Sequence, residues 1–249
     1  MKVSDYNKNI YEKFFSDGNE NLYYKAHELK IKKMIDLIDD SPKKILDLGC
    51  ADGFLGKILK ELYQAEVHGI DLAEKSLKIA EKRGIITKKF DLSLKKWPYK
   101  NNFFDLIIAG DVIEHIYDTE KFISECNRIL KTNGQLIIST PNLNAYCNRI
   151  LVLLGKMPLG LDFAANLSMY KYLPPMGHIR ILNKGSLIKL IKEFDLKIEI
   201  ICGGNLYVDK NIFHKNLQPF VFLINIIDNI FSKFPSLSSL LLVKSRKIN

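Results

Sequence analysis

Three carboxylates in the first half of the chain have the type and spacing to bind one ligand. Asp47 lies in the run ILDLGCADG, Asp71 ends the run VHGID, and Asp91 follows TKKF. Asp71 comes about twenty residues after the glycine-rich turn, the spacing at which a carboxylate accepts hydrogen bonds from both ribose hydroxyls. Asp91 could accept one from an adenine amino group. Together, the three carboxylates favour a nucleoside with cationic substituents, and they would repel a pyrophosphate.

A glycine-rich turn follows the first of these carboxylates. Gly49 and Gly53 bracket the turn, and Ala51 lies between them. Glycine permits a positive φ and a close approach of the backbone to a ligand, and a helix that begins here offers unpaired N–H groups. The turn alone also fits a strand-to-helix connection without a ligand. The position of Asp71 favours the ligand.

The elements that must position these residues follow from the hydrophobic pattern. Short apolar runs alternate with amphipathic helical segments along the chain. This alternation implies an α/β fold with a doubly wound, mostly parallel sheet, right-handed crossovers and helices on both faces. The expected strands are residues 43–49, 66–71, 87–91, 104–110, 135–139, 196–202 and 240–247. The expected helices are residues 53–62, 74–83, 118–130 and 183–193.

Three segments interrupt this pattern within what we expect to be one domain, residues 1–249. Residues 1–40 contain a helical stretch that is expected to form a lid. Residues 142–181 are rich in Met, Tyr, Leu, Pro and Gly and are expected to cover the carboxyl edge of the sheet. In the C-terminal part of the sheet, 182–249, an apolar helix is expected at 219–234. Core packing is the favoured interpretation of this helix, and a membrane contact or a dimer surface are the alternatives.

Composition bounds the class of protein. The chain is 47% apolar and 26% charged, which is ordinary for a globular domain. Its net charge of +9 could favour anionic partners. The lysines are spread along the chain, however, so a solvated basic surface is the favoured interpretation. Nucleic acid is not favoured as a partner, because basic and aromatic residues do not interleave.

Cysteine usage and hydropathy indicate the compartment. No CxxC pair is present, which argues against a zinc site or a disulfide framework and suits a reducing cytoplasm. The four cysteines are Cys50, Cys126, Cys147 and Cys202. No apolar run reaches the ~20 residues that cross a bilayer, and the first residues lack the apolar stretch of a signal peptide. We therefore expect a cytoplasmic protein without a metal, at most peripheral to a membrane.

Five segments occur in an order that identifies a family. They are ILDLGCADG, VHGIDLAEKSLKIA, FDLS, FDLIIAGDVIEHI and LKTNGQLIISTPN. Together they resemble the class I, Rossmann-like S-adenosylmethionine-dependent methyltransferases over roughly residues 43–142. The resemblance implies S-adenosyl-L-methionine as the cofactor. It also implies a seven-stranded sheet in which an antiparallel C-terminal strand, residues 240–247, is inserted beside the sixth strand.

The resemblance implies cofactor-binding roles for the residues that match the family's motifs. The glycine turn and Asp47 would hold the methionine moiety, Asp71 the ribose, and two strand-end carbonyls the amino group. Hydrophobic residues beside the second and third carboxylates would pack against the adenine. A tyrosine of the N-terminal lid would touch the cofactor carboxylate. The positions are Tyr11, Asp47, Gly49, Gly53, Asp71, Leu72, Asp91, Leu92, Ala109 and Gly110.

Three further residues could act on the methyl acceptor. His115 follows the fourth strand and His178 ends the insertion, and either could be a general base if the acceptor is a hydroxyl. Arg180 could hold an anionic acceptor. Structural roles for all three stay open. The aromatic insertion resembles those of enzymes that act on small molecules, so the expected acceptor is an oxygen of a sugar, a quinone or a lipid-linked intermediate.

Two alternatives remain. The first is a non-catalytic relative that binds the cofactor, because the carboxylates indicate binding and not turnover. The second is a nicotinamide-dependent reductase on a related fold. A reductase requires GxGxxG, whereas this chain has GxxxG, and the pair Tyr117 and Lys121 follows the fourth strand, where that fold does not need it.

Overall fold

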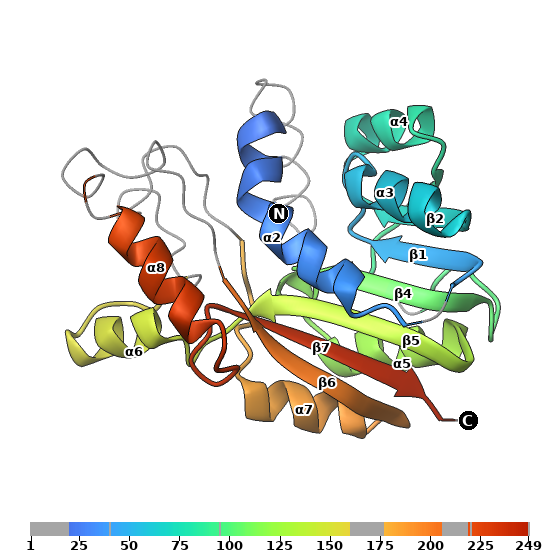
Figure 1. The fold of residues 1–249 in the computed structure, drawn as a ribbon. Coiled ribbons are helices and arrows are strands. Elements are labelled where there is room, and N and C mark those ends of the chain that lie inside the picture. Colours follow the sequence, from blue (N-terminus) through green and yellow to red (C-terminus); the bar gives the residue numbers. More distant parts are fainter. Residues whose placement is uncertain are drawn as a thin grey trace.

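The computed structural model describes residues 20–39, 41–94, 96–159, 177–205, 219 and 221–248. Its strands form one sheet in the order β3-β2-β1-β4-β5-β7-β6 (Figure 1). The strands are β1 Lys44–Leu48, β2 Glu66–Asp71, β3 Ile86–Lys89, β4 Phe104–Gly110, β5 Leu130–Pro141, β6 Leu196–Gly204 and β7 Leu240–Lys247. β7 runs antiparallel to both its neighbours. The mostly parallel α/β sheet with an antiparallel C-terminal strand is therefore confirmed.

Helices cover both faces of this sheet. Two separate hydrophobic cores lie on its two sides, one beneath α2, α3 and α4 and the other beneath α5 and α7. The helices are α2 Glu20–Asp36, α3 Phe54–Tyr63, α4 Glu74–Lys82, α5 Thr119–Ile129, α6 Tyr146–Leu153, α7 Lys184–Lys192 and α8 Val221–Phe231. A 3₁₀ turn, η1, spans Ile113–His115. The doubly wound arrangement follows because a buried parallel sheet must have both faces covered.

Local signals in the sequence set several of these boundaries. In β4, Leu106 and Ile108 enter one core while Ile107 enters the other, as period-two alternation requires in a strand that is buried on both faces. Helix α7 begins where Asn183 and Ser186 form a reciprocal capping box. Its predicted start is confirmed.

Two strands differ from the prediction. β5 begins at Leu130 rather than at residue 135, because Leu130 pairs with Phe104 before the register shifts. β3 ends at Lys89, so Asp91 lies in the following loop and does not close the strand. The segment 142–181 also contains a helix, α6, and residues 160–176 lie outside the described residues.

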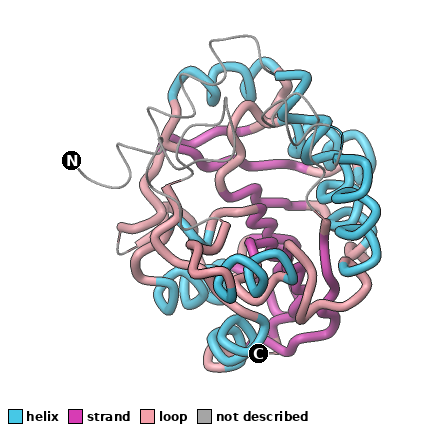
Figure 2. Tube along the Cα trace, turned by 90° about the vertical axis from the view of Figure 1, so that its left-hand side faces the viewer, coloured by secondary structure: helices cyan, strands magenta, loops and turns pink. Residues whose placement is uncertain are grey.

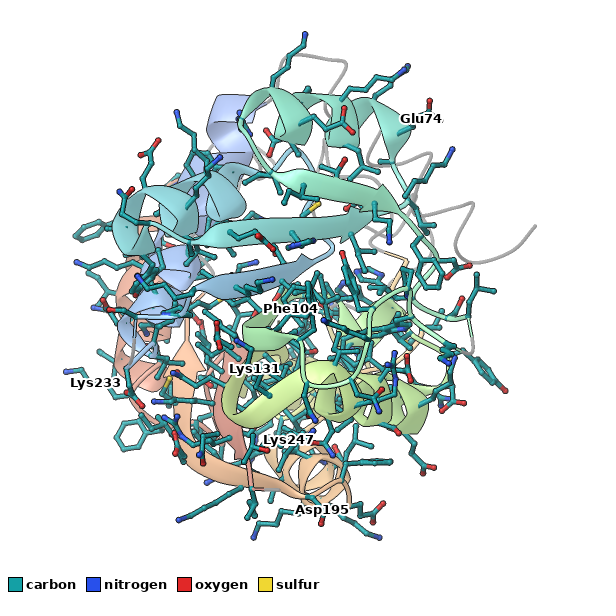
Figure 3. The ribbon with its side chains drawn as sticks, turned by 90° about the vertical axis from the view of Figure 1, so that its right-hand side faces the viewer. Glu74, Phe104, Lys131, Asp195, Lys233 and Lys247 are labelled. Atoms are coloured by element: carbon teal, nitrogen blue, oxygen red, sulfur yellow. The ribbon has the colours of Figure 1, made fainter. Side chains whose placement is uncertain are left out.

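The carboxyl ends of the parallel strands meet at one edge, and Figure 2 views the molecule from this side. Figure 1 shows α6 and α8 beyond this edge. The opposite edge is marked in Figure 3 by Phe104 at the start of β4, by Lys131 in β5 and by Lys247 at the end of β7. Helices α6 and α8 thus lie beyond the part of this edge formed by β5, β7 and β6, while the predicted ligand residues Asp47 and Asp71 lie at the ends of β1 and β2.

The apolar helix α8 does not pack as expected. Phe222 is 76% exposed and Ile230 is 52% exposed, while Val221 and Asp228 are buried. On α6, Leu153 is 86% exposed. The core-packing prediction for this helix is therefore wrong, and its apolar face is on the surface. Within the described part of the chain, no helix is long and apolar enough to span a membrane.

Candidate functional site

The turn after β1 has a left-handed backbone that glycine best accommodates. Gly49 and Gly53 have φ values of 68° and 75°. A Cβ at Gly53 would lie 2.7 Å from the Cβ of Ala80, so a larger residue there would collide with α4. Ala51 adopts the same region, with φ of 46°, at a cost of about 1 kcal/mol. The turn therefore keeps its left-handed backbone although its middle residue carries a Cβ.

Asp71 joins this turn to the end of β2. Its Oδ2 accepts a hydrogen bond from the Ala51 N–H at 2.9 Å, and its Oδ1 accepts one from the Ala73 N–H at 2.8 Å. Burial raises the pKa of Asp71, while these N–H donors lower it. The structure thus brings together the two segments that the sequence spacing predicted to share a ligand.

Asp47 is buried near the end of β1, where it lies close to two other carboxylates. Its pKa is raised to about 8 by burial and by the charges of Asp71 and Asp52. Asp52 is paired with Arg83, whose guanidinium also donates to the Asp52 carbonyl at 3.0 Å. The charge of Lys30 lowers the pKa of Asp47, but by less than these effects raise it. A cation placed beside Asp47 would favour its ionised form, so this cluster suits a ligand that carries positive charge.

A buried ion pair lies directly after β4. Lys30 on α2 contacts Asp111 Oδ2 with its Nζ at 2.5 Å, and Ser139 Oγ donates to Asp111 Oδ1 at 2.7 Å. Burial acts to raise the pKa of Asp111, but Lys30 opposes it and the pKa falls well below its usual range. The pair therefore anchors α2 across the strand ends, next to the 3₁₀ turn that carries His115.

The third cluster consists of Glu114, His115 and His178. Glu114 is fully buried, and its Oε1 lies 3.9 Å from His178 Nε2. The two histidine rings meet edge to face with centroids 4.8 Å apart. Burial, together with Asp111, raises the pKa of Glu114, and burial lowers the pKa of His115. The structure thus places together two histidines that the sequence suggested only separately as general bases.

Arg180 takes a different position. Its Nη2 donates to the Tyr117 carbonyl at 2.9 Å, and its guanidinium lies 5.1 Å from the centre of the Tyr117 ring. The backbone N–H of Arg180 also donates to the Glu114 carbonyl at 3.0 Å. The exposed side chain therefore packs on Tyr117, outside the buried cluster of histidines. A role in holding an anionic acceptor stays a prediction.

The remaining predicted positions are spread along the same edge. Leu72 is half-buried just after β2, while Ala109 and Gly110 end β4. Asp91 accepts a hydrogen bond from the Ser93 N–H at 2.9 Å, and Leu92 beside it is buried. Their contacts with a ligand stay predictions. Tyr11 lies outside the described residues.

Sequence reasoning missed Lys30, Asp52 and Asp111 as members of this edge. Asp111 and Asp52 had a usable signal, because each follows a strand whose carboxyl end was already assigned to the site. Lys30 had none, since it lies 81 residues before its partner on a helix with no distinguishing motif.

Comparisons with known proteins agree with this geometry. A family model described as a methyltransferase domain matches residues 22–200. A malonyl-[acyl-carrier protein] O-methyltransferase of Legionella pneumophila is 36% identical over 104 residues, which cover 40% of this chain and 37% of that protein. The chain thus spans between 37% and 44% of the length of the first curated relatives that it matches. A demethylmenaquinone methyltransferase of Thermotoga maritima is 28% identical over 178 residues, 68% of this chain and 77% of that protein.

Solved structures agree on the fold. A SAM-dependent methyltransferase of Archaeoglobus fulgidus superimposes with a TM-score of 0.62 at 16% identity, over 92% of this chain and 100% of that chain.

Proposed function

Because the chain belongs to the class I S-adenosylmethionine-dependent methyltransferases, we propose that it transfers a methyl group to an oxygen of a small-molecule acceptor. The acceptor class is a quinone, a sugar or a lipid-linked intermediate. The observation that carries the proposal is the buried carboxylate cluster around Asp47. A site with three carboxylates suits a ligand that carries an ammonium and a sulfonium group, and it would repel the pyrophosphate of a dinucleotide.

The residues present fit the cofactor. The left-handed turn at Gly49 and Gly53 keeps side chains away from the strand end, where the methionine moiety would lie. Asp47 would pair with the amino group of the methionine moiety. The raised pKa of this carboxyl supports the pairing, because a cation beside it would stabilise its ionised form. Asp71, oriented by two backbone N–H groups, would hold the ribose. When bound, the cofactor supplies a methyl group that its sulfonium already activates.

The remaining assignments of the adenine site belong to the same proposal. Leu72 and Leu92 would pack against the adenine, and Asp91 would accept a hydrogen bond from its amino group. The carbonyls of Ala109 and Gly110 would face the cofactor's amino group. These positions lie at or just after the carboxyl ends of β2, β3 and β4, at the edge where β1 and β2 carry Asp47 and Asp71. Their shared edge supports the assignment.

On the acceptor side, the protein mainly needs to align a nucleophile with the methyl group and to exclude water. His115 and His178 lie together after β4 and would serve as the base for a hydroxyl acceptor. Exposed apolar side chains on α6 and α8 lie beyond the same edge (Figure 1). An apolar acceptor, or one carried on a lipid, suits such surroundings. The relative named for demethylmenaquinone methylation supports a quinone as the acceptor, and the malonyl-carrier relative supports oxygen as the methylated atom.

Titration calorimetry with S-adenosylhomocysteine tests the cofactor part of the proposal. Asp71→Asn is expected to weaken binding by about 10–100-fold, since it removes a charged acceptor of ribose hydrogen bonds. Asp195→Asn is the matched control, because Asp195 is exposed at the far end of the sheet, where α7 leads into β6 (Figure 3). Asn also tolerates its φ of 52°. Absence of binding in the unmodified protein would refute the cofactor assignment.

Methyl transfer is tested separately. Purified protein with methyl-labelled cofactor is offered hydroquinones, sugar nucleotides and a lipid extract in detergent. Label is expected in one of these fractions. Tight cofactor binding without label in any fraction would instead favour a non-catalytic cofactor-binding relative. Tight binding of NAD in place of S-adenosylhomocysteine would favour the reductase alternative.

A further inference from the structure

Two segments that are distant in the sequence are held together by backbone hydrogen bonds at the carboxyl edge. The Glu114 carbonyl accepts hydrogen bonds from the N–H groups of Ile179 and Arg180, both at 3.0 Å. The segment that carries His178 is therefore fixed against the 3₁₀ turn that carries Glu114 and His115. These backbone bonds keep the two segments that carry the three side chains next to each other.

Potential metal-ligand atoms of these side chains lie close to one another. One nitrogen of each histidine and one oxygen of Glu114 all lie within 4.8 Å of one another, and Glu114 and His178 are buried. Among the described residues, Glu114 Oε1 has no hydrogen-bond partner. A fully buried carboxylate oxygen without a partner is costly, and it indicates a missing ligand at this point.

The groups behind these atoms orient them. His115 Nδ1 lies 3.3 Å from the Gly177 carbonyl, so it donates to that oxygen and leaves the ring's lone pair on Nε2. Thr140 Oγ1 donates to Glu114 Oε2 at 3.1 Å, which directs the other carboxylate oxygen toward His178. A histidine that donates to a carbonyl and a carboxylate held by a hydroxyl are the usual outer contacts of metal ligands.

We propose that Glu114, His115 and His178 bind one divalent transition-metal ion of the zinc class. Two imidazoles and one carboxylate are the donor set of open, catalytic sites, whereas magnesium and calcium prefer oxygen alone. An ion about 2.0–2.2 Å from each donor requires the three side chains to draw together by roughly 1 Å. Three protein ligands leave at least one position for an exogenous oxygen.

The use of that open position rests on the proposed function. A hydroxyl of the acceptor that binds the ion would lose its proton to solvent more readily, because a divalent cation lowers the pKa of a bound hydroxyl. The O–CH₃ bond would then form as the methyl–sulfur bond breaks, with the electron pair of that bond remaining on sulfur. The ion would thus orient and activate an oxygen acceptor beside the cofactor site.

Metal binding is measured on the metal-stripped full chain without cofactor, by zinc titration against a chelating dye and by the visible spectrum with cobalt(II). We expect one zinc ion per chain with a Kd below about 10 µM, and intense cobalt absorption from low-symmetry nitrogen coordination. His178→Gln and His115→Gln are each expected to weaken zinc binding by at least about 100-fold.

His68→Gln is the matched control. His68 Nε2 lies 2.8 Å from Glu66 Oε1, so this pair has a histidine and a carboxylate but lies apart from the three proposed ligands. Its substitution is expected to leave zinc affinity unchanged. Thermal unfolding of each variant without metal identifies any that fails to fold, and His115→Gln and His178→Gln provide independent tests of the same site.

Failure of zinc, cobalt(II) and manganese(II) to bind, or equal zinc affinity in the protein and in both proposed-ligand variants, overturns the inference. Binding of S-adenosylhomocysteine is measured on the same samples. If it binds while zinc does not, the metal site is wrong and the proposed function stands. If zinc binds while S-adenosylhomocysteine does not, the metal site stands and the proposed cofactor role is wrong.

Discussion

The raised pKa of Asp47 predicts that cofactor binding expels a proton. This carboxyl has a pKa of about 8 in the protein without ligand, because it is buried beside Asp71 and Asp52 and only weakly offset by Lys30. At pH 7 about nine-tenths of the molecules therefore hold a proton on Asp47. If the cofactor's ammonium group pairs with the carboxylate, that proton must leave. Binding is expected to release about 0.9 proton at pH 7.

The affinity for S-adenosylhomocysteine should then rise with pH. Since the ligand selects the ionised carboxylate, the binding constant is expected to increase about tenfold for each unit between pH 6 and pH 7.5. Titration calorimetry in buffers of different ionisation enthalpy measures the released proton directly. Asp47→Asn should abolish both the proton release and this pH dependence, and should weaken binding by about 10–100-fold at pH 8.

The same pKa has the opposite consequence for the stability of the ligand-free protein. The folded pKa lies above the unfolded value of 3.8, so the folded state prefers the protonated acid. The penalty is absent below about pH 4 and grows as pH rises toward 8, reaching about 4 kcal/mol at pH 7. Asp47→Asn is therefore expected to stabilise the ligand-free fold at pH 7 and to change it little at pH 4, as measured by urea unfolding.

Two outcomes would refute this reasoning. One is an affinity that is constant between pH 6 and pH 7.5 with no proton release in the unmodified protein. The other is Asp47→Asn losing stability equally at both pH values, which would indicate a packing defect in place of a removed charge. Asp195→Asn, far from the site, should reproduce the behaviour of the unmodified protein in every measurement.

Three further predictions concern stability and surface. Lys30→Met should cost about 3 kcal/mol in urea unfolding, because it leaves Asp111 buried without its cation. Gly53→Ala should destabilise the fold by more than about 2 kcal/mol, because it adds a collision with α4 to the backbone strain. Gly155→Ala is the control and should cost about 1 kcal/mol, since Gly155 has a similar φ but no atom near its added Cβ. We also propose that α8 contacts membranes peripherally, so that part of the protein floats with anionic liposomes and Phe222→Ser reduces that fraction.

Each of these predictions has a contradicting result. Unchanged stability in Lys30→Met would mean that the charge of Lys30 does not stabilise the fold, and that only the packing of its aliphatic side chain does. Equal losses of stability in Gly53→Ala and Gly155→Ala would show that the collision with Ala80 does not contribute to the effect. Recovery of all the protein in the dense, lipid-free fraction would exclude the membrane contact.

The order of strands and helices could be predicted because it depends on short-range patterns. Residues 104–110 read as a strand buried on both faces, and β4 occupies those positions. The errors arose where neighbours in space decided the outcome. β5 begins early because it pairs with Phe104, and α8 stays on the surface although its apolar spacing suits a core helix equally well.

In the candidate site, too, the residues that depend on local patterns were predicted and the contacts between distant segments were not. Asp47, Asp71 and the glycine turn were correctly expected at one edge, since the carboxyl ends of neighbouring parallel strands must lie side by side. The spacing between turn and carboxylate is realised as the hydrogen bond from Ala51 to Asp71. Arg180 packs against Tyr117 because its backbone is tied to Glu114, a contact that no local pattern encodes.

The sequence by itself determined the family, the sheet and the edge at which a cofactor would bind, because strand periodicity and turn residues act over a few neighbouring positions. Only the tertiary structure decided which distant side chains complete that edge. Lys30 meets Asp111 because α2 crosses the strand ends, and His178 meets Glu114 and His115 because two loops share backbone hydrogen bonds. Such contacts depend on how helices pack and loops close, and neither leaves a periodic signature in the chain.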